Sequence, residues 1–308
     1  MKARVYKSTG SWYQVKDEAG NTWLARTKGK LKIAGSKATN PVAVGDWVII
    51  ELLQDEPGHA LIQSVCDRNN HMVRSSPHSR FQQHVVAANL DQSVLLATIR
   101  SPKTSLGFID RFLVTAEAYH VPAALIFNKT DLLDADDLQQ LEEVQAIYDA
   151  IGYPVYTTSL LEQSGLEAIQ LLFSNKTTLL TGHSGVGKST FINYLLPELD
   201  LRTQDVSDWS GKGLHTTTFA EMFDLPGGGR IIDTPGIREL GIVDISRQEL
   251  SHYFPEMRER LQECQFNNCL HQNEPGCAIK EAVMSGAIHP DRYASYLGIC
   301  DTIIERKY

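Results

Sequence analysis

The chain has 308 residues, of which 42% are hydrophobic and 21% are charged, and its net charge is -8. This length predicts two or three domains and allows at least one substantial core. No apolar run approaches the roughly 20 residues that span a bilayer, and the N-terminal residues lack the apolar segment of a secretory signal. We therefore expect a cytoplasmic protein without membrane contact, and the acidic balance excludes a surface that is basic throughout.

Residues 1–66 predict about five short strands, with examples at 11–15, 22–25 and 46–53 separated by glycine-containing turns. This spacing is typical of a small barrel of the OB type, and an SH3-like barrel is the alternative. Residues 26–37 contain five Lys or Arg and no acid, which indicates either a solvated face or a nucleic-acid contact. The polar, aperiodic residues 67–80 predict a linker.

From about residue 84 apolar runs alternate with longer helical stretches. The predicted strands and helices alternate as follows: strand 93–99, helix 109–119, strand 123–127, helix 138–151, strands 153–157 and 177–181, and a helix from 189. A strand pair over 219–225 and 230–232 follows, joined by a Pro-Gly-Gly-Gly turn. This alternation predicts a mostly parallel sheet covered by helices on both faces.

Residues 246–308 show no strand pattern and predict helices interrupted by a Cys/His cluster. We therefore expect three domains. The first is a barrel over residues 1–70, the second an α/β domain over 71–245, and the third a helical domain over 246–308.

A phosphate loop is indicated by residues 182–190, GHSGVGKST, which match G-x-x-x-x-G-K-[ST] between an apolar strand and a helix. Backbone N–H groups in such a loop point at a polyphosphate, and the helix N-terminus adds partial positive charge. Lys188 would reach the β- and γ-phosphates, and the Ser189 hydroxyl would bind magnesium.

A guanine-reading motif, Asn128-Lys129-Thr130-Asp131, directly follows the predicted strand 123–127. The Asp131 carboxylate can accept hydrogen bonds from N1–H and the exocyclic amine of guanine, whereas adenine would leave it unsatisfied. Asn128 can bridge the base and the phosphate loop, and the Lys129 stem can cover the ring. Ser159, after the strand 153–157, suits support of the base.

Two segments resemble the switches of a GTPase. Residues 233–236 read Asp-Thr-Pro-Gly after an apolar strand, so Asp233 is placed to hold magnesium and the Gly236 N–H to sense a γ-phosphate. Between this motif and the phosphate loop lie three threonines, 216–218, and we assign Thr217 to the magnesium shell. The flanking glycines permit a segment that the γ-phosphate orders.

The group that orients the attacking water is not evident from the pattern. Many GTPases place a glutamine just after D-x-x-G, but this chain has Ile237 there. His215 is the best internal candidate for the catalytic residue, although a lone histidine is also compatible with a structural role. Slow intrinsic turnover that a partner raises is the expected behaviour.

The predicted nucleotide site therefore draws on four separate segments. Its GTP-binding residues are Asn128, Lys129, Thr130, Asp131, Ser159, Gly182, His183, Ser184, Gly185, Val186, Gly187, Lys188, Ser189, Thr190 and Gly236. Its magnesium ligands are Ser189, Thr217 and Asp233.

A metal site is indicated by Cys264, Cys269, His271 and Cys277, which supply three thiolates and one imidazole within 14 residues. Four such ligands suit a closed tetrahedral zinc site, and the absence of an open position makes the metal structural. In a cytosolic chain, clustered cysteines favour a metal over disulfides.

These motifs, in this order, resemble the circularly permuted GTPases of the RsgA family, also called YjeQ or YloQ. The resemblance covers nearly the whole chain, including VGDWV in the barrel, AANLDQ at 87–92, NKTD, GHSGVGKST, HTTT, DTPG and the Cys/His cluster. The diagnostic feature is the order, because ordinary GTPases place N-K-x-D after D-x-x-G. Two departures are His183, where the family usually has Gln, and Leu214, where Arg is common.

The resemblance implies an OB-fold, a permuted GTPase domain and a helical zinc domain. It also implies GTP hydrolysis that the small ribosomal subunit stimulates, and a role in late maturation of that subunit through rRNA. We expect a monomer. Two alternatives are an RNA-binding assembly module in which the nucleotide is only structural, and an ATP-dependent enzyme, against which Asp131 argues.

Overall fold

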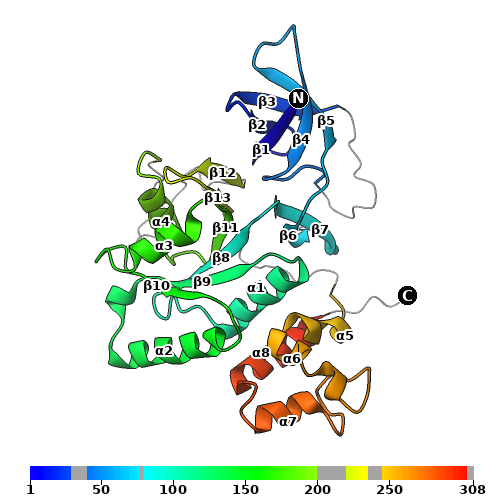
Figure 1. The fold of residues 1–308 in the computed structure, drawn as a ribbon, viewed down its shortest axis with the longest axis vertical. Coiled ribbons are helices and arrows are strands. Elements are labelled where there is room, and N and C mark those ends of the chain that lie inside the picture. The colour runs from blue at the N-terminus through cyan, green and yellow to red at the C-terminus, as the bar shows by residue number, and fades with distance from the viewer. Residues whose placement is uncertain (29–39, 77–78, 200–219, 235–244, 304–308) are drawn as a thin grey trace, which may run out of the picture.

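The computed structural model describes residues 1–28, 40–76, 79–199, 220–234 and 245–303. Five N-terminal strands form a closed barrel (Figure 1). They are β1 (Lys2–Ser8), β2 (Tyr13–Asp17), β3 (Thr22–Thr27), β4 (Trp47–Leu52) and β5 (His59–Val65). Their order is β1-β2-β3-β5-β4, and β4 pairs back with β1. This closed five-stranded order is that of the OB-fold, which decides between the two predicted barrels.

The predicted linker over residues 67–80 is wrong, because much of it forms strand. Strand β6 (His71–Ser76) pairs antiparallel with β7 (Ser79–Ala88) in a separate two-stranded sheet. Met72 and Val73 are fully buried in this hairpin. The polar neighbours of this apolar pair hide the strand in the sequence, and pairing with the apolar end of β7 supplies the missing stabilisation.

A central sheet follows, and its strands are β8 (Gln92–Ala97), β9 (Ala123–Phe127), β10 (Val155–Thr157), β11 (Thr177–Gly182), β12 (Glu221–Asp224) and β13 (Arg230–Asp233). The order is β10-β9-β8-β11-β13-β12, and all pairs are parallel except β12–β13. The predicted mostly parallel sheet is therefore confirmed.

Four helices cover this sheet: α1 (Leu106–Ala118), α2 (Ala135–Asp149), α3 (Leu166–Phe173) and α4 (Lys188–Leu195). The strand β8 explains the two layers, because its side chains alternate between faces. Leu95 packs in one apolar cluster with residues of α1 and α2, and Leu96 packs in another with residues of α3 and α4. Figure 1 shows these two helix pairs on opposite faces of the sheet.

Local chemistry sets the start of α2 three residues before the predicted 138. The Asp134 carboxylate accepts a hydrogen bond from the Asp137 backbone N–H, and the Asp137 carboxylate accepts one from the Asp134 backbone N–H. This reciprocal cap satisfies backbone donors of the first turn and fixes the start of the helix. A 3₁₀ turn over Thr130–Leu132 lies just before it. The short helix α3 was not predicted.

The C-terminal unit, residues 245–303, is helical as predicted. Its helices are α5 (Arg247–Leu250), α6 (Pro255–Arg258), α7 (Ala278–Met284) and α8 (Pro290–Thr302), with 3₁₀ turns at Ser251–Tyr253 and Leu261–Glu263. The barrel and this unit lie at opposite ends of the long axis, with the central sheet between them (Figure 1). Among the described helices, none combines the length and apolar character needed to cross a membrane.

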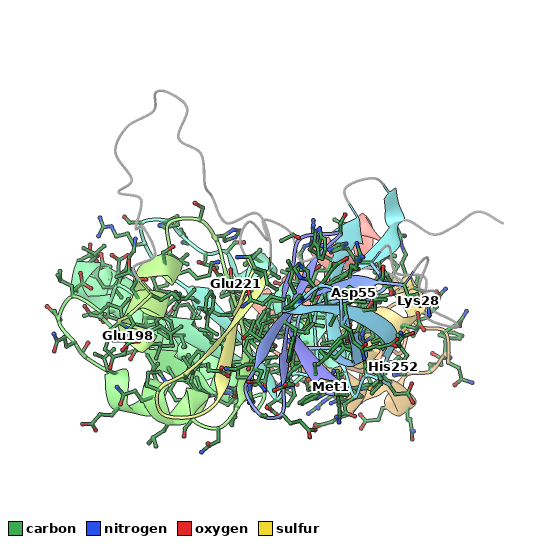
Figure 2. The ribbon with its side chains drawn as sticks, turned by 90° about the horizontal axis from the view of Figure 1, so that it is seen from above. Met1, Lys28, Asp55, Glu198, Glu221 and His252 are labelled. Atoms are coloured by element: carbon green, nitrogen blue, oxygen red, sulfur yellow. The ribbon has the colours of Figure 1, made fainter. Side chains whose placement is uncertain are left out.

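The barrel and the central sheet share one continuous sheet of 11 strands, because β12 pairs antiparallel with β1. At this boundary Lys7 pairs with Glu221 at 2.7 Å. Seen from above, Glu221 lies where the central sheet meets the barrel (Figure 2). Strand β12, which follows the predicted threonine switch in the chain, is thus also the strand that pairs with the barrel.

Candidate nucleotide site and metal cluster

The predicted guanine reader, phosphate loop and Asp233 meet at one edge of the central sheet. They follow or end β9, β11 and β13, and these strands run parallel to one another through β8. In this register Leu180, near the end of β11, lies opposite Asp233. Carboxyl ends of parallel strands are the usual place for ligands in such sheets.

The guanine reader is held in place by hydrogen bonds. The Ser159 hydroxyl donates to the Asp131 carboxylate at 2.5 Å, and the Glu162 backbone N–H donates to the Ser159 oxygen at 3.0 Å. The Thr130 backbone N–H donates to the Thr158 carbonyl at 3.3 Å. One oxygen of Asp131 is therefore anchored, which fixes the orientation of the carboxylate.

Two side chains tie this reader to the phosphate loop. The Asn128 amide donates to the Val186 carbonyl at 2.9 Å, and Lys129 Nζ donates to the Gly185 carbonyl at 2.6 Å. The Oδ1 atom of Asn128 is buried and has no hydrogen-bond partner among the described residues. A buried orphan oxygen between the two motifs fits a site that a nucleotide completes.

Gly187 is required where the phosphate loop passes Asn128. Its φ is +94°, a conformation that favours glycine, and an added Cβ would lie 2.6 Å from the Asn128 amide nitrogen. Helix α4 begins at the next residue, so its unpaired N–H groups face the loop. Ser184, Ser189 and Thr190 are exposed, His183 is half-buried, and Gly182 is the last residue of β11.

Lys188 contacts the Asp233 carboxylate, and its Nζ also donates to the Thr234 carbonyl at 3.3 Å. The two charged side chains are 15% and 12% exposed, so the pair is largely shielded from water. Lys188, which is predicted to bind the phosphates, and Asp233, which is predicted to bind magnesium, are therefore in contact with each other. The predicted residues His215, Thr217 and Gly236 lie outside the described residues.

Sequence reasoning missed the segment between β8 and α1. Lys129 Nζ also donates to the Ser101 carbonyl at 2.8 Å, and a Cβ on Gly185 would lie 3.4 Å from Pro102. The ring of His183 packs on Phe108, with centroids 3.7 Å apart and an angle of 31° between planes. Burial lowers the pKa of His183, which favours its neutral form. No motif marks this segment.

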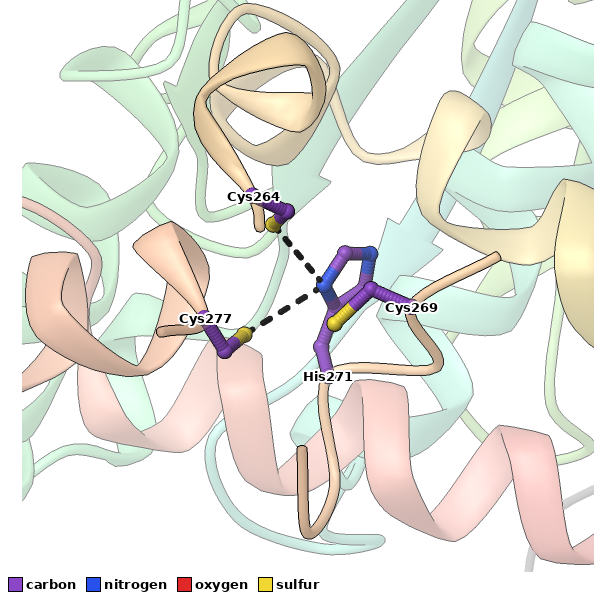
Figure 3. A group of neighbouring side chains, drawn as sticks. All are labelled: Cys264, Cys269, His271 and Cys277. Atoms are coloured by element: carbon purple, nitrogen blue, oxygen red, sulfur yellow. Dashed lines mark hydrogen bonds between the residues drawn. The ribbon is translucent and has the colours of Figure 1, made fainter. Parts of the chain in front are cut away.

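The four predicted metal ligands converge in the C-terminal unit (Figure 3). The ligand atoms of Cys264, Cys269, His271 and Cys277 lie within 4.8 Å of one another. The His271 Nδ1 atom is 3.6 Å from the Cys264 sulfur and 3.5 Å from the Cys277 sulfur. A metal with bonds of about 2.3 Å to sulfur and about 2.1 Å to nitrogen, at a tetrahedral angle, would hold the sulfur and nitrogen atoms about 3.6 Å apart. The cluster therefore fits a tetrahedral metal site.

Neighbouring groups fix the loop that carries His271. The Glu274 carboxylate accepts backbone hydrogen bonds from Leu270, Gln272 and Asn273 at 2.9–3.0 Å. From α8, the Tyr293 hydroxyl donates to the His271 carbonyl at 2.6 Å. Burial raises the pKa of the Cys269 thiol, so a metal must displace its proton. Among the described residues, every cysteine is free of disulfides.

Family comparisons agree with this architecture. Residues 2–60 match the model of the RsgA N-terminal domain, and residues 65–243 match that of the RsgA GTPase. Proteins from Phocaeicola vulgatus and Bacteroides fragilis, each named small ribosomal subunit biogenesis GTPase RsgA, are 47% identical to this chain. Both alignments cover 100% of this chain and 99% of the relative.

Solved structures show the same arrangement of elements. The crystal structure of YjeQ from Thermotoga maritima has a TM-score of 0.78 at 34% identity and covers 99% of each chain. YloQ, described as a circularly permuted GTPase, has a TM-score of 0.72 at 30% identity over 99% of this chain and 96% of its own. The two family-model matches and the relatives that are 47% identical over the full length show that this chain belongs to the RsgA family of GTPases.

Proposed function

We propose that this chain binds GTP at the site described above and hydrolyses it to GDP and phosphate when the small ribosomal subunit stimulates it. It would act in late maturation of that subunit. The observation that best supports this proposal is the contact between the guanine-reading motif and the phosphate loop, in which Asn128 and Lys129 both hydrogen-bond to the loop. Relatives that align over the full chain are named for the same activity.

Each part of the nucleotide meets a different group. Asp131, held by Ser159, reads the guanine edge, and the backbone of 182–190 cradles the phosphates. On binding, Lys188 exchanges Asp233 for the β- and γ-phosphates, which frees the Asp233 carboxylate. That carboxylate and the Ser189 hydroxyl would then hold magnesium, and the ion supplies charge stabilisation at the phosphates. Thr217 and Gly236 are proposed to complete this arrangement, and His215 to orient the water.

The metal of the Cys/His cluster is proposed to be zinc. Three thiolates and one imidazole form a closed set of soft and borderline ligands, which is typical of structural zinc. The three cysteine ligands belong to the same buried cluster as Phe254, Met257 and Tyr296. Zinc would therefore stabilise the core of the C-terminal unit.

Contact with rRNA is proposed for the barrel. Residues 1–70 contain ten Lys or Arg and seven Asp or Glu, a net charge of +3. Residues 71–245 contain 12 Lys or Arg and 21 Asp or Glu, a net charge of -9. Residues 246–308 contain seven Lys or Arg and nine Asp or Glu, a net charge of -2. The barrel is thus the part whose charge attracts a polyanion. A cytoplasmic location is proposed, since the small subunit is the partner. A monomer is proposed as the oligomeric state.

Co-sedimentation tests the proposal. Purified small subunits should pellet the wild-type chain with a non-hydrolysable GTP analogue at least about tenfold better than with GDP. Lys188→Ala should abolish this difference because the phosphate contact is lost. Lys176→Ala removes a lysine outside the predicted motifs, whose Nζ donates to the Gln92 side chain at 3.1 Å, and should behave as wild type. Equal pelleting with analogue and GDP would contradict a nucleotide-controlled role on the subunit.

A further inference from the structure

Helix α1 contacts the phosphate loop at one end and the C-terminal unit along its length. We propose that α1 couples these two sites, so that nucleotide at the phosphate loop tightens the C-terminal unit and that unit in turn changes nucleotide affinity. The inference rests on the nucleotide site proposed above. It concerns Phe108 and Asp110 as positioning residues, because neither belongs to the predicted binding motifs.

The first turn of α1 touches the phosphate loop through side chains. The His183 ring lies on Phe108 at 3.7 Å between centroids. The segment that leads into α1 is also linked to the loop through Lys129, whose Nζ donates to the carbonyls of Ser101 and Gly185. A displacement of the loop on binding phosphates would therefore move the start of α1.

Two residues further on, α1 enters a buried ionic network. The Asp110 carboxylate is fully buried and accepts hydrogen bonds from Arg292 of α8 at 2.5 Å and from the Tyr148 hydroxyl at 2.8 Å. Arg292, which is 2% exposed, also donates twice to Glu256 of α6, at 2.7 and 3.1 Å. One guanidinium thus joins α1 to two helices of the C-terminal unit.

The rest of α1 continues this contact. Val114 is fully buried in the apolar cluster of the C-terminal unit. Arg258 donates to Glu117 at 3.0 Å, and Arg111 donates to Thr302 at 3.0 Å. The C-terminal unit therefore includes part of α1 in its own core.

The network has little freedom to rearrange. Arg292 is fixed between two carboxylates and also packs over the Phe254 ring at 4.6 Å. The second Asp110 oxygen has no hydrogen-bond partner among the described residues. A shift of α1 would separate buried opposite charges, which is costly. Sub-ångström shifts are transmitted by such packed, discretely paired contacts, and the coupling is reciprocal.

Hydrogen–deuterium exchange of the full chain, with and without GDP, tests this coupling. In the wild type, GDP should slow exchange of the α8 backbone amides by about fivefold or more. Phe108→Leu removes the ring contact but keeps an apolar side chain, and Asp110→Asn keeps the shape but removes the charge. Both should still bind a fluorescent GDP analogue, with the α8 protection reduced to less than half.

A matched control is His59→Ala, which removes an imidazole–aromatic contact with Trp12 in the barrel and should retain full α8 protection. If Phe108→Leu binds GDP and keeps wild-type protection of α8, the inference is wrong. It is also wrong if GDP binds the wild type without slowing α8. If the wild type binds no GDP, the nucleotide site itself fails, and the inference with it. Should Asp110→Asn not fold, Phe108→Leu alone decides.

Discussion

At the residue scale, the proposed selection of guanine depends on one carboxylate. Asp131 is held through one oxygen by the Ser159 hydroxyl at 2.5 Å, so its other oxygen is available to a base. The sequence motif predicts Asp131 and the strand pattern places Ser159 after β10. The hydrogen bond between them comes from the fold, because 28 residues separate the two in the chain.

Asp131→Asn should relax guanine selection. The amide presents a donor where guanine also has donors, so the preference for GTP over ATP should fall by about 100-fold or more. Competition of GTP and ATP against a fluorescent guanine nucleotide measures this ratio. Asp136→Asn, an exposed change on α2, is the control. An unchanged ratio in Asp131→Asn would remove Asp131 from the reader role.

Gly187→Ala should weaken nucleotide binding. The new Cβ would lie 2.6 Å from the Asn128 amide nitrogen at a φ of +94°, and strain of about 1–3 kcal/mol corresponds to a loss of roughly 5- to 150-fold in affinity. Gly152→Ala imposes a similar φ of +88° with nothing within 4 Å. Titration of a fluorescent GDP analogue should therefore show wild-type affinity for Gly152→Ala, and equal losses in both variants would rule out the contact with Asn128.

At the element scale, the strands and helices with clear periodicity were predictable. Strand 123–127 was predicted with the bounds it has in the structure, because it is a buried apolar run followed by a polar motif. The hairpin β6–β7 was missed, since its polar residues do not alternate and its stability comes from pairing. The pairing of β12 with β1 was also unpredictable, because the two strands are more than 200 residues apart in the chain.

The contact between β12 and the barrel gives a pH-dependent prediction. Asp224 accepts hydrogen bonds from Tyr6 at 2.7 Å and from Lys16 at 2.5 Å. Burial raises the pKa of Asp224, but these donors outweigh it and hold the pKa below its ordinary value. A carboxyl with a lowered folded pKa stabilises the fold above its unfolded pKa, near 3.9, and this contribution is lost as the pH falls through the folded value.

Asp224→Asn should therefore lower the free energy of unfolding near pH 7 by only about 0.5–1 kcal/mol, because the side chain is 41% exposed and water screens the pairs. Urea denaturation at pH 7 and at pH 3 should show that the difference from wild type shrinks at the lower pH. A difference that grows with acid would contradict the assignment.

At the scale of the whole molecule, the GTPase sheet lies between a barrel and the helical unit that holds the Cys/His cluster (Figure 1). The three units and the cluster of Cys264, Cys269, His271 and Cys277 were predictable from motif order and spacing. Their mutual contacts were not, because Asp110 and Arg292 show no pattern that would mark either as buried. The predicted catalytic His215 stays a prediction.

Loss of the metal should loosen the C-terminal unit. Cys277→Ser should reduce the bound zinc from one equivalent to near zero and lower Tm, since Cys277 belongs to the buried cluster of that unit. Cys66→Ser, which lies in the barrel region outside the cluster, should keep one equivalent. Metal content by mass spectrometry and limited proteolysis check both variants. Full zinc occupancy in Cys277→Ser would contradict the proposed ligand set.

The most direct test of the central claim is GTP turnover by the purified chain, measured with and without small ribosomal subunits. We predict slow turnover alone and an increase of about tenfold or more with subunits, with ATP not used and Lys188→Ala inactive. His215→Ala should lose the stimulated rate if this residue orients the water. No hydrolysis under either condition, despite tight GTP binding, would contradict the claim and favour an RNA-binding assembly factor in which the nucleotide is structural.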